Sequence, residues 1–463
     1  MPDEFTPLEW LALVEHELLL FAGVFFLFGA LDELAVDAIW LWLRVTRGPQ
    51  TRRIDRSQVR SVPLAGPAAV LIPCWHEERV IAHTVAHALA AWPQQCWRLY
   101  VGCYRNDPAT MHAALRGAAG DPRVRLVVLG RDGPTTKADC LNRLYAALET
   151  DERRTGARFR MVLLHDAEDM VDPAALALLD QAIGEAAFVQ LPVLPEPQPR
   201  SRLVGSHYCE EFAESHGKAM IVREALGVGL PASGVGCAFA REMLETVAGQ
   251  LGAPGPFAID SLTEDYELGL RIREAGGRAR FLRARGEDGR LVATRACFPA
   301  RIDQAVRQKA RWVHGIALQG WDRMGWTGGA AERWMRLRDR RGPLSALVLF
   351  VGYSVLVLAP VVWLASAFGW IRPWQPDPLR DWLIALNLAA FAWRALVRWA
   401  FTAREYGPLE GARAVLRIPV ANAIAIMAGR RGTWAYYRTL RGAAARWDKT
   451  FHDTHPAARE LPA

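Results

Sequence analysis

The segment Ser261-Leu262-Thr263-Glu264-Asp265-Tyr266 is followed about forty residues later by Arg307-Gln308-Lys309-Ala310-Arg311-Trp312, and these two segments decide the fold. The first supplies adjacent carboxylates. If the second is helical, Gln308, Arg311 and Trp312 lie at i, i+3 and i+4 and share one face. The guanidinium matches phosphate oxygens, the amide offers another hydrogen bond, and the indole offers a flat apolar surface to a sugar ring. The two segments therefore predict a sugar-transfer site.

Each segment also has a structural interpretation. Ser261 and Glu264 have the spacing of a helix capping box, and Glu264 with Asp265 at a helix start would be stabilised by the helix dipole. Trp312 on an amphipathic helix would equally suit a core position. It is the order and spacing of the two segments together that favours the functional interpretation.

Thr263-Glu264-Asp265 followed by Gln308-x-x-Arg311-Trp312 resembles the membrane glycosyltransferases of family 2, which include cellulose, chitin and hyaluronan synthases. The resemblance implies an α/β domain of the GT-A type, with transmembrane helices on its N- and C-terminal sides. It also implies an inverting transfer from a nucleotide sugar, expected to be a UDP-sugar, to a glycan or lipid acceptor in polysaccharide synthesis. Asp265 would be the general base, and Glu264 the next candidate.

The composition favours a membrane protein. The chain of 463 residues contains 18 Trp, is 51% hydrophobic and has a net charge of +7. Because the arginines gather beside apolar segments, they indicate the cytoplasmic side of a membrane and not a nucleic-acid partner. The seven Cys show no C-x-x-C pairing, which disfavours zinc and fits free thiols in a reducing compartment.

The N-terminal region predicts one transmembrane helix. Residues 18–31 are continuously apolar, and the run resumes at residues 38–43 after Asp32, Glu33 and Asp37. A helix over residues 18–43 would cross a core of ~30 Å. Its carboxylates should face protein or the interface, because charge is costly in lipid. No basic segment precedes it, so we expect no cleaved signal peptide. The arginines within residues 44–60 place the following chain on the cytoplasmic side.

From residue 68 onward, short apolar segments alternate with helical ones. The expected strands are residues 69–72, 99–103, 124–129, 161–164 and 188–193. This alternation predicts a mostly parallel sheet with ligand contacts at the strand ends. We therefore expect three parts: a transmembrane helix with its basic flank (residues 1–60), a glycosyltransferase domain (61–335) and C-terminal transmembrane or interfacial helices (336–463).

Polar residues follow the first three expected strands. Glu77 matches the glutamate of the family's nucleotide loop, Asp107 matches its uracil-contacting aspartate, and Lys137 lies in a segment like Gly-Lys-Ala-x-x-Leu-Asn, with Thr136 in place of glycine. Asp107 also fits an ordinary Asn-Asp-Pro turn, and Lys137 a solvated surface position. The resemblance implies a donor-binding set: Glu77, Asp107, Lys137, Asp166, Gln308 and Arg311.

His165-Asp166-Ala167-Glu168-Asp169 follows the fourth strand. It resembles the family's Asp-x-Asp, with Glu168 in place of the second aspartate. Carboxylates there could hold a Mg²⁺ or Mn²⁺ ion that bridges two phosphates. We expect metal ligands among Asp166, Glu168 and Asp169. Asp169 or Asp172 could instead cap a helix ahead of Pro173.

The small-residue segment Ser233-Gly-Val-Gly-Cys-Ala-Phe-Ala-Arg241 resembles part of the family's acceptor pocket. Glycine permits the close approach of a sugar or of backbone, and a plain tight turn explains Gly234 and Gly236 equally well. With Trp312, these two glycines form the expected acceptor site.

The C-terminal region predicts two further spans, at residues 344–371 and 382–401. Residues 409–427 are ambiguous because Arg413, Arg417 and Pro419 interrupt them and more arginines follow. A third span would put those arginines outside, so we prefer an interfacial or re-entrant helix.

Trp447-Asp448-Lys449-Thr450-Phe451-His452, with the segment after Trp312, is most similar to one branch of the family, the inner-membrane glycosyltransferases named phage adsorption protein B. The branch implies a multi-pass protein of the bacterial inner membrane with a cytoplasmic catalytic domain. An outer-membrane or secretion partner stays open. Longer members carry a cyclic-dinucleotide-sensing module that is missing here, so we do not expect that regulation. Two rivals remain: a transferase that adds one sugar to a polyprenyl phosphate, and a membrane scaffold or phage receptor with a weak site.

Overall fold

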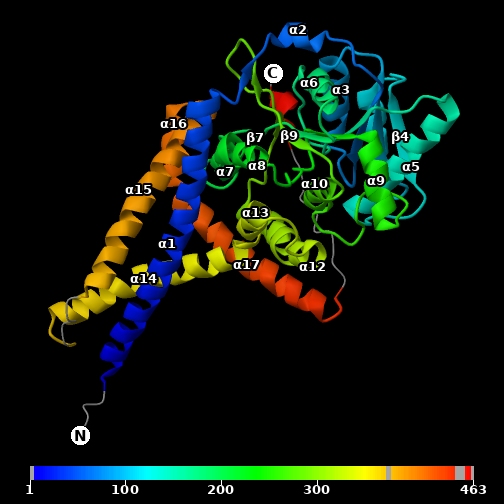
Figure 1. Cartoon of the computed structure of the whole chain (residues 1–463). Coiled ribbons are helices and arrows are strands. Elements are labelled where there is room, and N and C mark those ends of the chain that lie inside the picture. Colours follow the sequence, from blue (N-terminus) through cyan, green and yellow to red (C-terminus); the bar gives the residue numbers. More distant parts are fainter. Residues whose placement is uncertain (1–4, 372–376, 444–453, 460–463) are drawn as a thin grey trace.

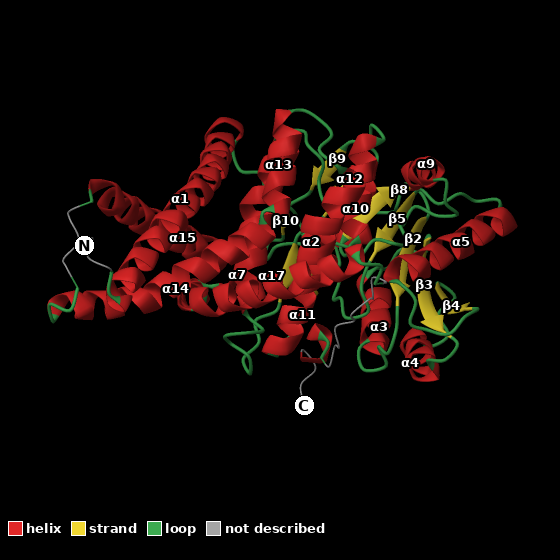
Figure 2. Cartoon of the chain, turned by 90° about the horizontal axis from the view of Figure 1, so that it is seen from below, coloured by secondary structure: helices red, strands yellow, loops and turns green. Residues whose placement is uncertain are grey.

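The structure is a computed structural model that describes residues 5–371, 377–443 and 454–459. An α/β body lies at one end of the molecule, and long helices run away from it (Figure 1). Seen from below, the strands lie together in the body while α1, α14 and α15 extend beyond it (Figure 2). The motif Trp447-Asp448-Lys449-Thr450-Phe451-His452 lies outside the described residues.

A seven-stranded sheet forms the centre of the body, in the order β4-β3-β2-β5-β8-β6-β9. All its pairings are parallel except those of β8 with β5 and β6. Two short parallel pairs lie outside this sheet, β1 with β10 and β7 with β11. The strands are β1 (Arg52–Arg53), β2 (Ala68–Pro73), β3 (Trp97–Tyr104), β4 (Val124–Leu129), β5 (Met161–Leu164), β6 (Phe188–Gln190), β7 (Val193–Pro195), β8 (Cys237–Ala240), β9 (Ala279–Phe281), β10 (Ala284–Arg285) and β11 (Thr294–Ala296).

Alternate side chains of β2 belong to different cores. Val70 and Ile72 pack with α3 (Ile81–Ala91), α4 (Pro108–Ala118) and α6 (Ala175–Ile183). Leu71 packs on the other side, with α5 (Lys137–Thr155), α9 (Arg241–Leu251) and α10 (Glu264–Glu274). Because successive residues of a strand point to opposite faces, a strand that is buried throughout marks a sheet covered on both sides.

The expectation of a mostly parallel sheet is confirmed, with two differences. Residues 188–193 were expected to form one strand, but the strand is interrupted between β6 and β7. Pro192 lacks the amide N–H that a continuing ladder needs, and β7 pairs with β11 instead of the main sheet. The second difference is β8, the one antiparallel strand of the main sheet, which lies in the segment expected to border the acceptor or to form a tight turn.

Among the residues that the structure describes, three helices are long and apolar enough to cross a membrane: α1 (Pro7–Arg47), α14 (Gly342–Ala367) and α15 (Pro378–Tyr406). Helix α1 begins earlier than expected because Thr6 and Glu9 form a capping box ahead of the apolar run. A fourth candidate is α16 (Pro408–Leu416) followed by α17 (Ile418–Leu440), which are bent by 52°. The break falls at Arg417, in the segment for which the sequence favoured an interfacial or re-entrant helix.

The acidic residues Asp32, Glu33 and Asp37 of α1 face protein, as expected. Glu33 Oε1 lies 2.8 Å from Arg338 Nη2, and Asp37 Oδ2 accepts a hydrogen bond from Trp393 Nε1 at 2.8 Å. Lys218, which is 2% exposed, pairs with Asp37 and with Glu214. We call this group the membrane-side cluster; it comprises Asp32, Glu33, Asp37, Glu214, Lys218, Arg338, Arg341 and Arg394.

Helix α17 returns from the long helices to the body, where it packs against α11 (Ile302–Trp312). A Cβ atom at Gly432 would lie 2.8 Å from the Ala310 carbonyl oxygen, so only glycine permits this approach. The remaining helices are α2 (Arg56–Arg60), α7 (His207–Glu214), α8 (Met220–Ala225), α12 (Gly320–Met324), α13 (Ala330–Arg340), two π-helical segments (Ser215–Ala219 and Val313–Gln319) and a 3₁₀ turn (Pro456–Arg459).

Candidate active site

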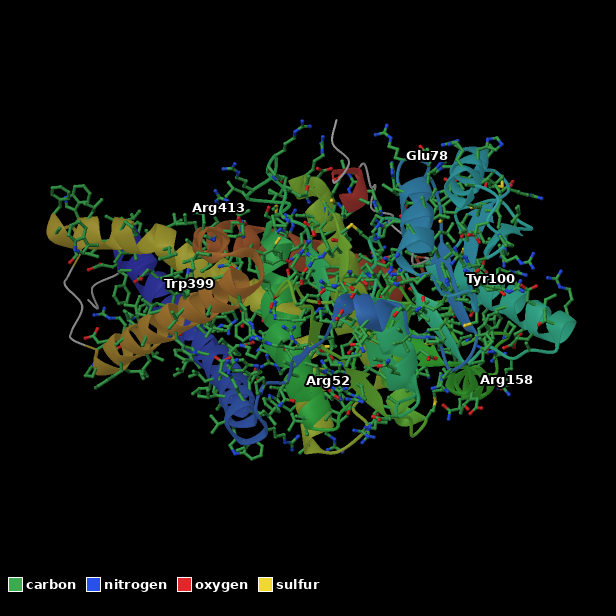
Figure 3. All side chains as sticks on the ribbon, turned by 90° about the horizontal axis from the view of Figure 1, so that it is seen from above. Arg52, Glu78, Tyr100, Arg158, Trp399 and Arg413 are labelled. Atoms are coloured by element: carbon green, nitrogen blue, oxygen red, sulfur yellow. The ribbon has the colours of Figure 1, made fainter. Side chains whose placement is uncertain are left out.

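The first four predicted site segments meet at one edge of the sheet. Strands β4, β3, β2 and β5 are adjacent and parallel, so their carboxyl ends lie side by side. Glu77, Asp107, Lys137 and Asp166 each follow one of these strands. Figure 3 shows Glu78 on the α/β body and Trp399 among the long helices.

Asp107 is 2% exposed and caps α4. Its Oδ2 accepts a hydrogen bond from the His76 amide at 2.6 Å, and its Oδ1 accepts one from the Thr110 amide at 3.3 Å. The Thr110 hydroxyl accepts a bond from the Glu77 amide at 2.9 Å. Asp107 therefore holds the loop after β2 against α4, whatever else it contacts.

Potential metal ligands also gather beside Asp107. Within the described residues, His76, Glu78 and Asp107 are the one group of three such side chains whose ligand atoms all lie within 4.8 Å of one another. Asp166 and Glu168 do not form a group of this kind. An ion bound by Asp166 and Glu168 would need further oxygen ligands, which the phosphates of a nucleotide sugar can supply.

Lys137 is the first residue of α5, and the Thr136 hydroxyl accepts a bond from the Asp139 amide at 3.2 Å. Lys137 Nζ lies 2.7 Å from Asp166 Oδ1 and 3.9 Å from Glu264 Oε1. Burial alone would lower the pKa of Lys137, but the carboxylates outweigh it and raise the pKa. The alternative of a solvated surface lysine is therefore wrong.

The three acids that follow β5 have different surroundings. Asp169 is 1% exposed, and its Oδ2 accepts a bond from the Asp166 amide and lies 2.9 Å from His165 Nδ1. Asp169 therefore stabilises the loop after β5 through its contacts with His165 and Asp166. The side chain of Asp166 is 33% exposed, and Glu168 is partly exposed. Of the three, Asp166 and Glu168 are the ones that a bound ion could reach.

Glu264 begins α10, but no capping box forms there. The Ser261 hydroxyl accepts a bond from the Thr263 amide at 3.3 Å, and α10 has no side-chain cap. Burial raises the pKa of Glu264 to about 7, with repulsion from Asp265 adding to the shift and attraction to Lys137 opposing it. Burial also raises the pKa of Asp265. Carboxyl groups with raised pKa values suit proton transfer near neutral pH.

Gly234 lies directly against Asp265. Its φ is +74°, and a Cβ atom there would lie 2.3 Å from Asp265 Oδ2. A Cβ atom at Gly236, whose φ is +60°, would lie 2.3 Å from the Thr294 hydroxyl. The turn is therefore present, whereas the close contact at each glycine is with a side chain and not with backbone. A side chain at position 234 would displace the Asp265 carboxylate.

Residues 307–312 are helical, as predicted, in α11. Arg311 and Trp312 line a hollow of about 440 Å³, solvent-open space included, together with Thr136, Lys137 and residues 261–265. Gln308 does not line it, because this side chain is buried one turn away and is 8% exposed. The expectation that all three side chains meet in one volume therefore holds only for Arg311 and Trp312.

Several buried polar atoms around α11 lack a hydrogen-bond partner in the described part of the chain. They include Gln308 Oε1, Arg311 Nε, the Thr263 hydroxyl and the Tyr208 hydroxyl. Buried polar atoms are normally paired, so such a concentration indicates where the polar groups of a ligand can bind. We call Lys137, Asp166, Glu264, Asp265 and Arg311 the active-site cluster.

Trp312 combines both interpretations that the sequence left open. It lines the hollow, and it also packs in a small core with Tyr208, its ring centroid 6.2 Å away in an edge-to-face arrangement. The sequence analysis did not identify Tyr208 as a site residue. It lies about a hundred residues before Trp312, and no local pattern links the two segments.

Comparison with known proteins identifies a family and a shared fold. Residues 65–315 match the family described as "Glycosyltransferase like family 2". The chain is 32% identical over 457 residues to "Bacteriophage adsorption protein B" of Escherichia coli K12 and to "Bacteriophage N4 adsorption protein B" of Escherichia coli O157:H7. These matches cover 93% of this chain but 61% of each relative.

A solved structure shares the fold. It is a mannosyltransferase from Pyrobaculum calidifontis in complex with GDP-Man and Mn²⁺, with a TM-score of 0.53 at 18% identity. The match covers 91% of this chain and 99% of that one, so the likeness extends over the long helices as well as the body.

Proposed function

The chain belongs to the glycosyltransferase-like family 2, and from that premise we propose that it is a membrane-bound inverting glycosyltransferase. It moves a sugar from a nucleotide donor, a UDP-sugar, to a hydroxyl group of a glycan or lipid acceptor. The observation that carries the proposal is the hollow in which Lys137, Asp265 and Arg311 meet. A base and two cations beside one open volume can accept a proton and stabilise a departing anion.

The donor occupies the carboxyl edge of the sheet in this proposal. The loops of Glu77 and Asp107 bind the nucleoside, and Lys137 and Arg311 attract the diphosphate. Arg311 has no ion pair within the described residues, so its guanidinium fork is available for two phosphate oxygens. Gln308 is buried one turn before Arg311, and its Oε1 has no hydrogen-bond partner among the described residues. In the proposal its amide forms a hydrogen bond with the bound donor.

Asp166 and Glu168 would hold Mg²⁺ or Mn²⁺. Their carboxylates are the hard oxygen ligands that these ions prefer, and both side chains are accessible. Asp169 does not fit, because its carboxylate is buried against His165 and the Asp166 amide. An ion bound there supplies positive charge to the diphosphate of the donor.

Asp265 acts as the general base. It takes the proton of the acceptor hydroxyl while that oxygen bonds to the anomeric carbon, and the bond from carbon to phosphate oxygen breaks in the same displacement. The electron pair leaves with the diphosphate, which Lys137 and Arg311 neutralise. Asp265 is more exposed than Glu264, which is 4% exposed, so an acceptor can reach it first. Trp312, with Gly234 and Gly236, borders the acceptor.

The catalytic domain lies on the cytoplasmic face of a bacterial inner membrane in this proposal, as the arginines at the ends of α1 and α15 favour. The product is a surface or secreted polysaccharide. A reporter fused after Arg60 should therefore read cytoplasmic, and one inserted at Asp377 should read periplasmic. The opposite readings would overturn this orientation.

Donor turnover tests the function itself. Membranes that contain the protein are incubated with labelled nucleotide sugars and Mn²⁺, and we expect transfer or slow hydrolysis of one donor. Excess chelator or Asp166→Asn should abolish it. Asp260→Asn, a change of the same kind at an exposed acid outside the hollow, is the matched control and should stay active. Turnover of no donor by the folded protein, or full turnover with chelator, would contradict the proposal.

A further inference from the structure

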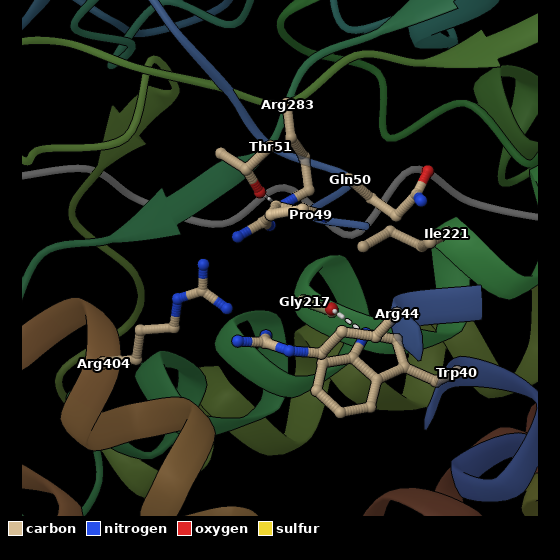
Figure 4. Close-up of a pocket in the computed structure, with 9 residues that line it drawn as sticks. All are labelled: Trp40, Arg44, Pro49, Gln50, Thr51, Gly217, Ile221, Arg283 and Arg404. Atoms are coloured by element: carbon tan, nitrogen blue, oxygen red, sulfur yellow. Dashed lines mark hydrogen bonds between the residues drawn. The ribbon is translucent and has the colours of Figure 1, made fainter. Parts of the chain in front are cut away.

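A second hollow lies where α1 and α15 approach the α/β body. Its walls include Trp40 and Arg44 from the last turns of α1, Thr51 from the following loop, Arg283 from between β9 and β10, and Arg404 from the end of α15 (Figure 4). It shares no lining residue with the hollow that holds Asp265. The transfer site does not use it.

Positive charge is in excess around this second hollow. Besides the three arginines in its wall, Arg285 lies close enough to interact with Arg404. Glu405 is the acid that faces them; it binds Arg283 at 3.3 Å and Arg285 at 2.5 Å. Four guanidinium groups thus surround one carboxylate.

Two of these arginines make no ion pair in the described part of the chain, although Arg404 is attracted to the neighbouring Glu405. Arg44 and Arg404 make neither a hydrogen bond nor an ion pair within the described residues; Arg44 lies over the Trp40 ring at 5.5 Å. Each nitrogen of Arg283 makes one bond, to the Thr51 hydroxyl at 3.2 Å, to the His216 carbonyl at 2.5 Å and to Glu405, which leaves two of its five N–H groups for a ligand. The guanidinium of Arg283 is thus held in the wall of the hollow, and the other two arginines of the wall, Arg44 and Arg404, make no ion pair with any described residue.

Such an arrangement is unfavourable without a counter-ion. Like charges at close range repel, and burial opposes the charged form of Arg283, lowering its pKa to about 10. A bound anion would remove both penalties. Guanidinium groups arranged around one volume suit a phosphate, which accepts several hydrogen bonds at once.

The hollow also has an apolar wall at the level of a membrane surface. Trp40 donates a hydrogen bond from Nε1 to the Gly217 carbonyl at 3.0 Å, which fixes the indole, and Ile221 lies beside it. Helices α1 and α15 are both long and apolar enough to cross a membrane. Trp40, Arg44 and Arg404 lie near the ends of these helices, where headgroups meet the aqueous phase.

We propose that this hollow binds a phosphate group through Arg44, Arg283 and Arg404, and that the phosphate belongs to the headgroup of an anionic phospholipid. Basic pockets between membrane helices are a recurrent way to hold such headgroups. A phosphate bound there would link α1 and α15 to the loop that follows α1 and leads into the α/β body.

The test uses the full chain, purified in a zwitterionic detergent and stripped of lipid. Binding of phosphatidylglycerol, phosphatidylcholine and inorganic phosphate is followed by native mass spectrometry and by the melting temperature. We expect phosphatidylglycerol to bind and to raise the melting temperature, and the other two to bind at least about tenfold more weakly. Equal binding of phosphatidylcholine, or of inorganic phosphate in competition with the lipid, would overturn the headgroup assignment.

A pair of double variants locates the site. Arg44→Gln with Arg404→Gln should weaken phosphatidylglycerol binding about tenfold or more, since each basic residue near a membrane surface contributes appreciably. Arg47→Gln with Arg380→Gln makes the same charge change on the same two helices but outside the hollow, and should bind as the wild type does. Equal losses in both variants would mean general surface charge and would contradict the proposal.

The lipid-free protein gives an independent measurement. Because Arg44 and Arg404 make no ion pair within the described ranges and repel each other, replacing them should leave the lipid-free melting temperature unchanged or higher. A lower melting temperature would show that they stabilise the fold themselves, and the proposal would fail. Arg283 is left intact, because its three hydrogen bonds make its loss structural.

Discussion

The membrane-side cluster and the active-site cluster balance their charges in different ways. In the membrane-side cluster every carboxylate of α1 contacts a cation, and two tryptophan N–H groups add hydrogen bonds to Asp32 and Asp37. In the active-site cluster three acids share Lys137, and only its pair with Asp166 is short. Arg311 keeps a buried nitrogen without a partner.

The difference in pairing indicates that the charges of the membrane-side cluster stabilise the fold, whereas those of the active-site cluster are available to a ligand. In the membrane-side cluster each carboxylate of α1 is paired with a cation, although Arg394 Nη1 lacks a hydrogen bond to any described residue. Removing one member of such a pair leaves its partner buried and uncompensated, so the paired members contribute to folding. An incompletely paired cluster already carries raised pKa values and unsatisfied atoms, and its members await groups that a ligand brings. Substitutions in the two clusters should therefore have opposite effects on stability and on transfer.

The largest effect is expected from Asp265→Asn. The amide keeps the size of the side chain but cannot accept a proton, so transfer should fall by about 10²–10⁴ while donor affinity stays near normal. The melting temperature should not decrease, because a carboxylate that is unfavourably buried is replaced by a neutral group. Transfer rates and thermal unfolding measure the two parts. Normal transfer, or equal losses of donor binding and transfer, would make Asp265 structural and Glu264 the next candidate.

Lys218→Met tests the membrane-side cluster. The change leaves Asp37 and Glu214 without their shared cation, so we expect a loss of about 3–5 kcal/mol in unfolding free energy. Molecules that remain folded should keep normal donor affinity. Glu245→Gln, which breaks an exposed pair with Arg158, is the control and should cost less than about 1 kcal/mol. If both variants melt alike, the membrane-side cluster is not structural.

Arg311→Ala should weaken donor binding and transfer together, because a charge-assisted hydrogen bond contributes about 1.5–3 kcal/mol. Arg311→Lys should recover only part of the loss, since a point charge replaces a bidentate fork. Donor titration with wild type and both variants measures this. Full recovery by lysine would leave Arg311 as a general positive charge and not a phosphate clamp.

The smallest effect is a pH dependence of stability. The folded-state pKa of Glu264, about 7, lies above its unfolded value. At pH values between these two pKa values, the folded state therefore binds more protons than the unfolded state. The resulting stabilisation is fully present at low pH and is lost as the pH rises through neutrality. Glu264→Gln, which stays neutral, should lose less stability between pH 5 and pH 8, by on the order of 1 kcal/mol. Identical pH profiles would refute the buried-acid assignment.

Much of the fold could be predicted because its signals are local. Four strands stand out as short apolar runs, and the polar residues that end them follow directly in the sequence. Helix α11 and the acids of α10 were also recognisable, because their spacing lies within one or two turns.

Features that depend on distant segments could not be predicted. The pairing of Lys137 with Asp166 joins two loops through the sheet, and the packing of Tyr208 on Trp312 joins two helices about a hundred residues apart. The sequence predicts that Gln308 shares a helical face with Arg311. It does not predict that Gln308 is buried, because the segments that cover it are distant in the sequence. Strand β8 was not predicted because glycine and alanine, which are frequent in this segment, have low β-propensity.

The packing of α17 on α11 has a consequence for biogenesis. Ile424 of α17 completes the small core that contains Tyr208 and Trp312, yet it is synthesised after α14 and α15. A nascent chain therefore carries every acid and base of the transfer site long before the support of Trp312 exists. In the proposed enzyme the site would therefore be complete only after α17 has packed on α11, so a chain that lacks this packing should be inactive.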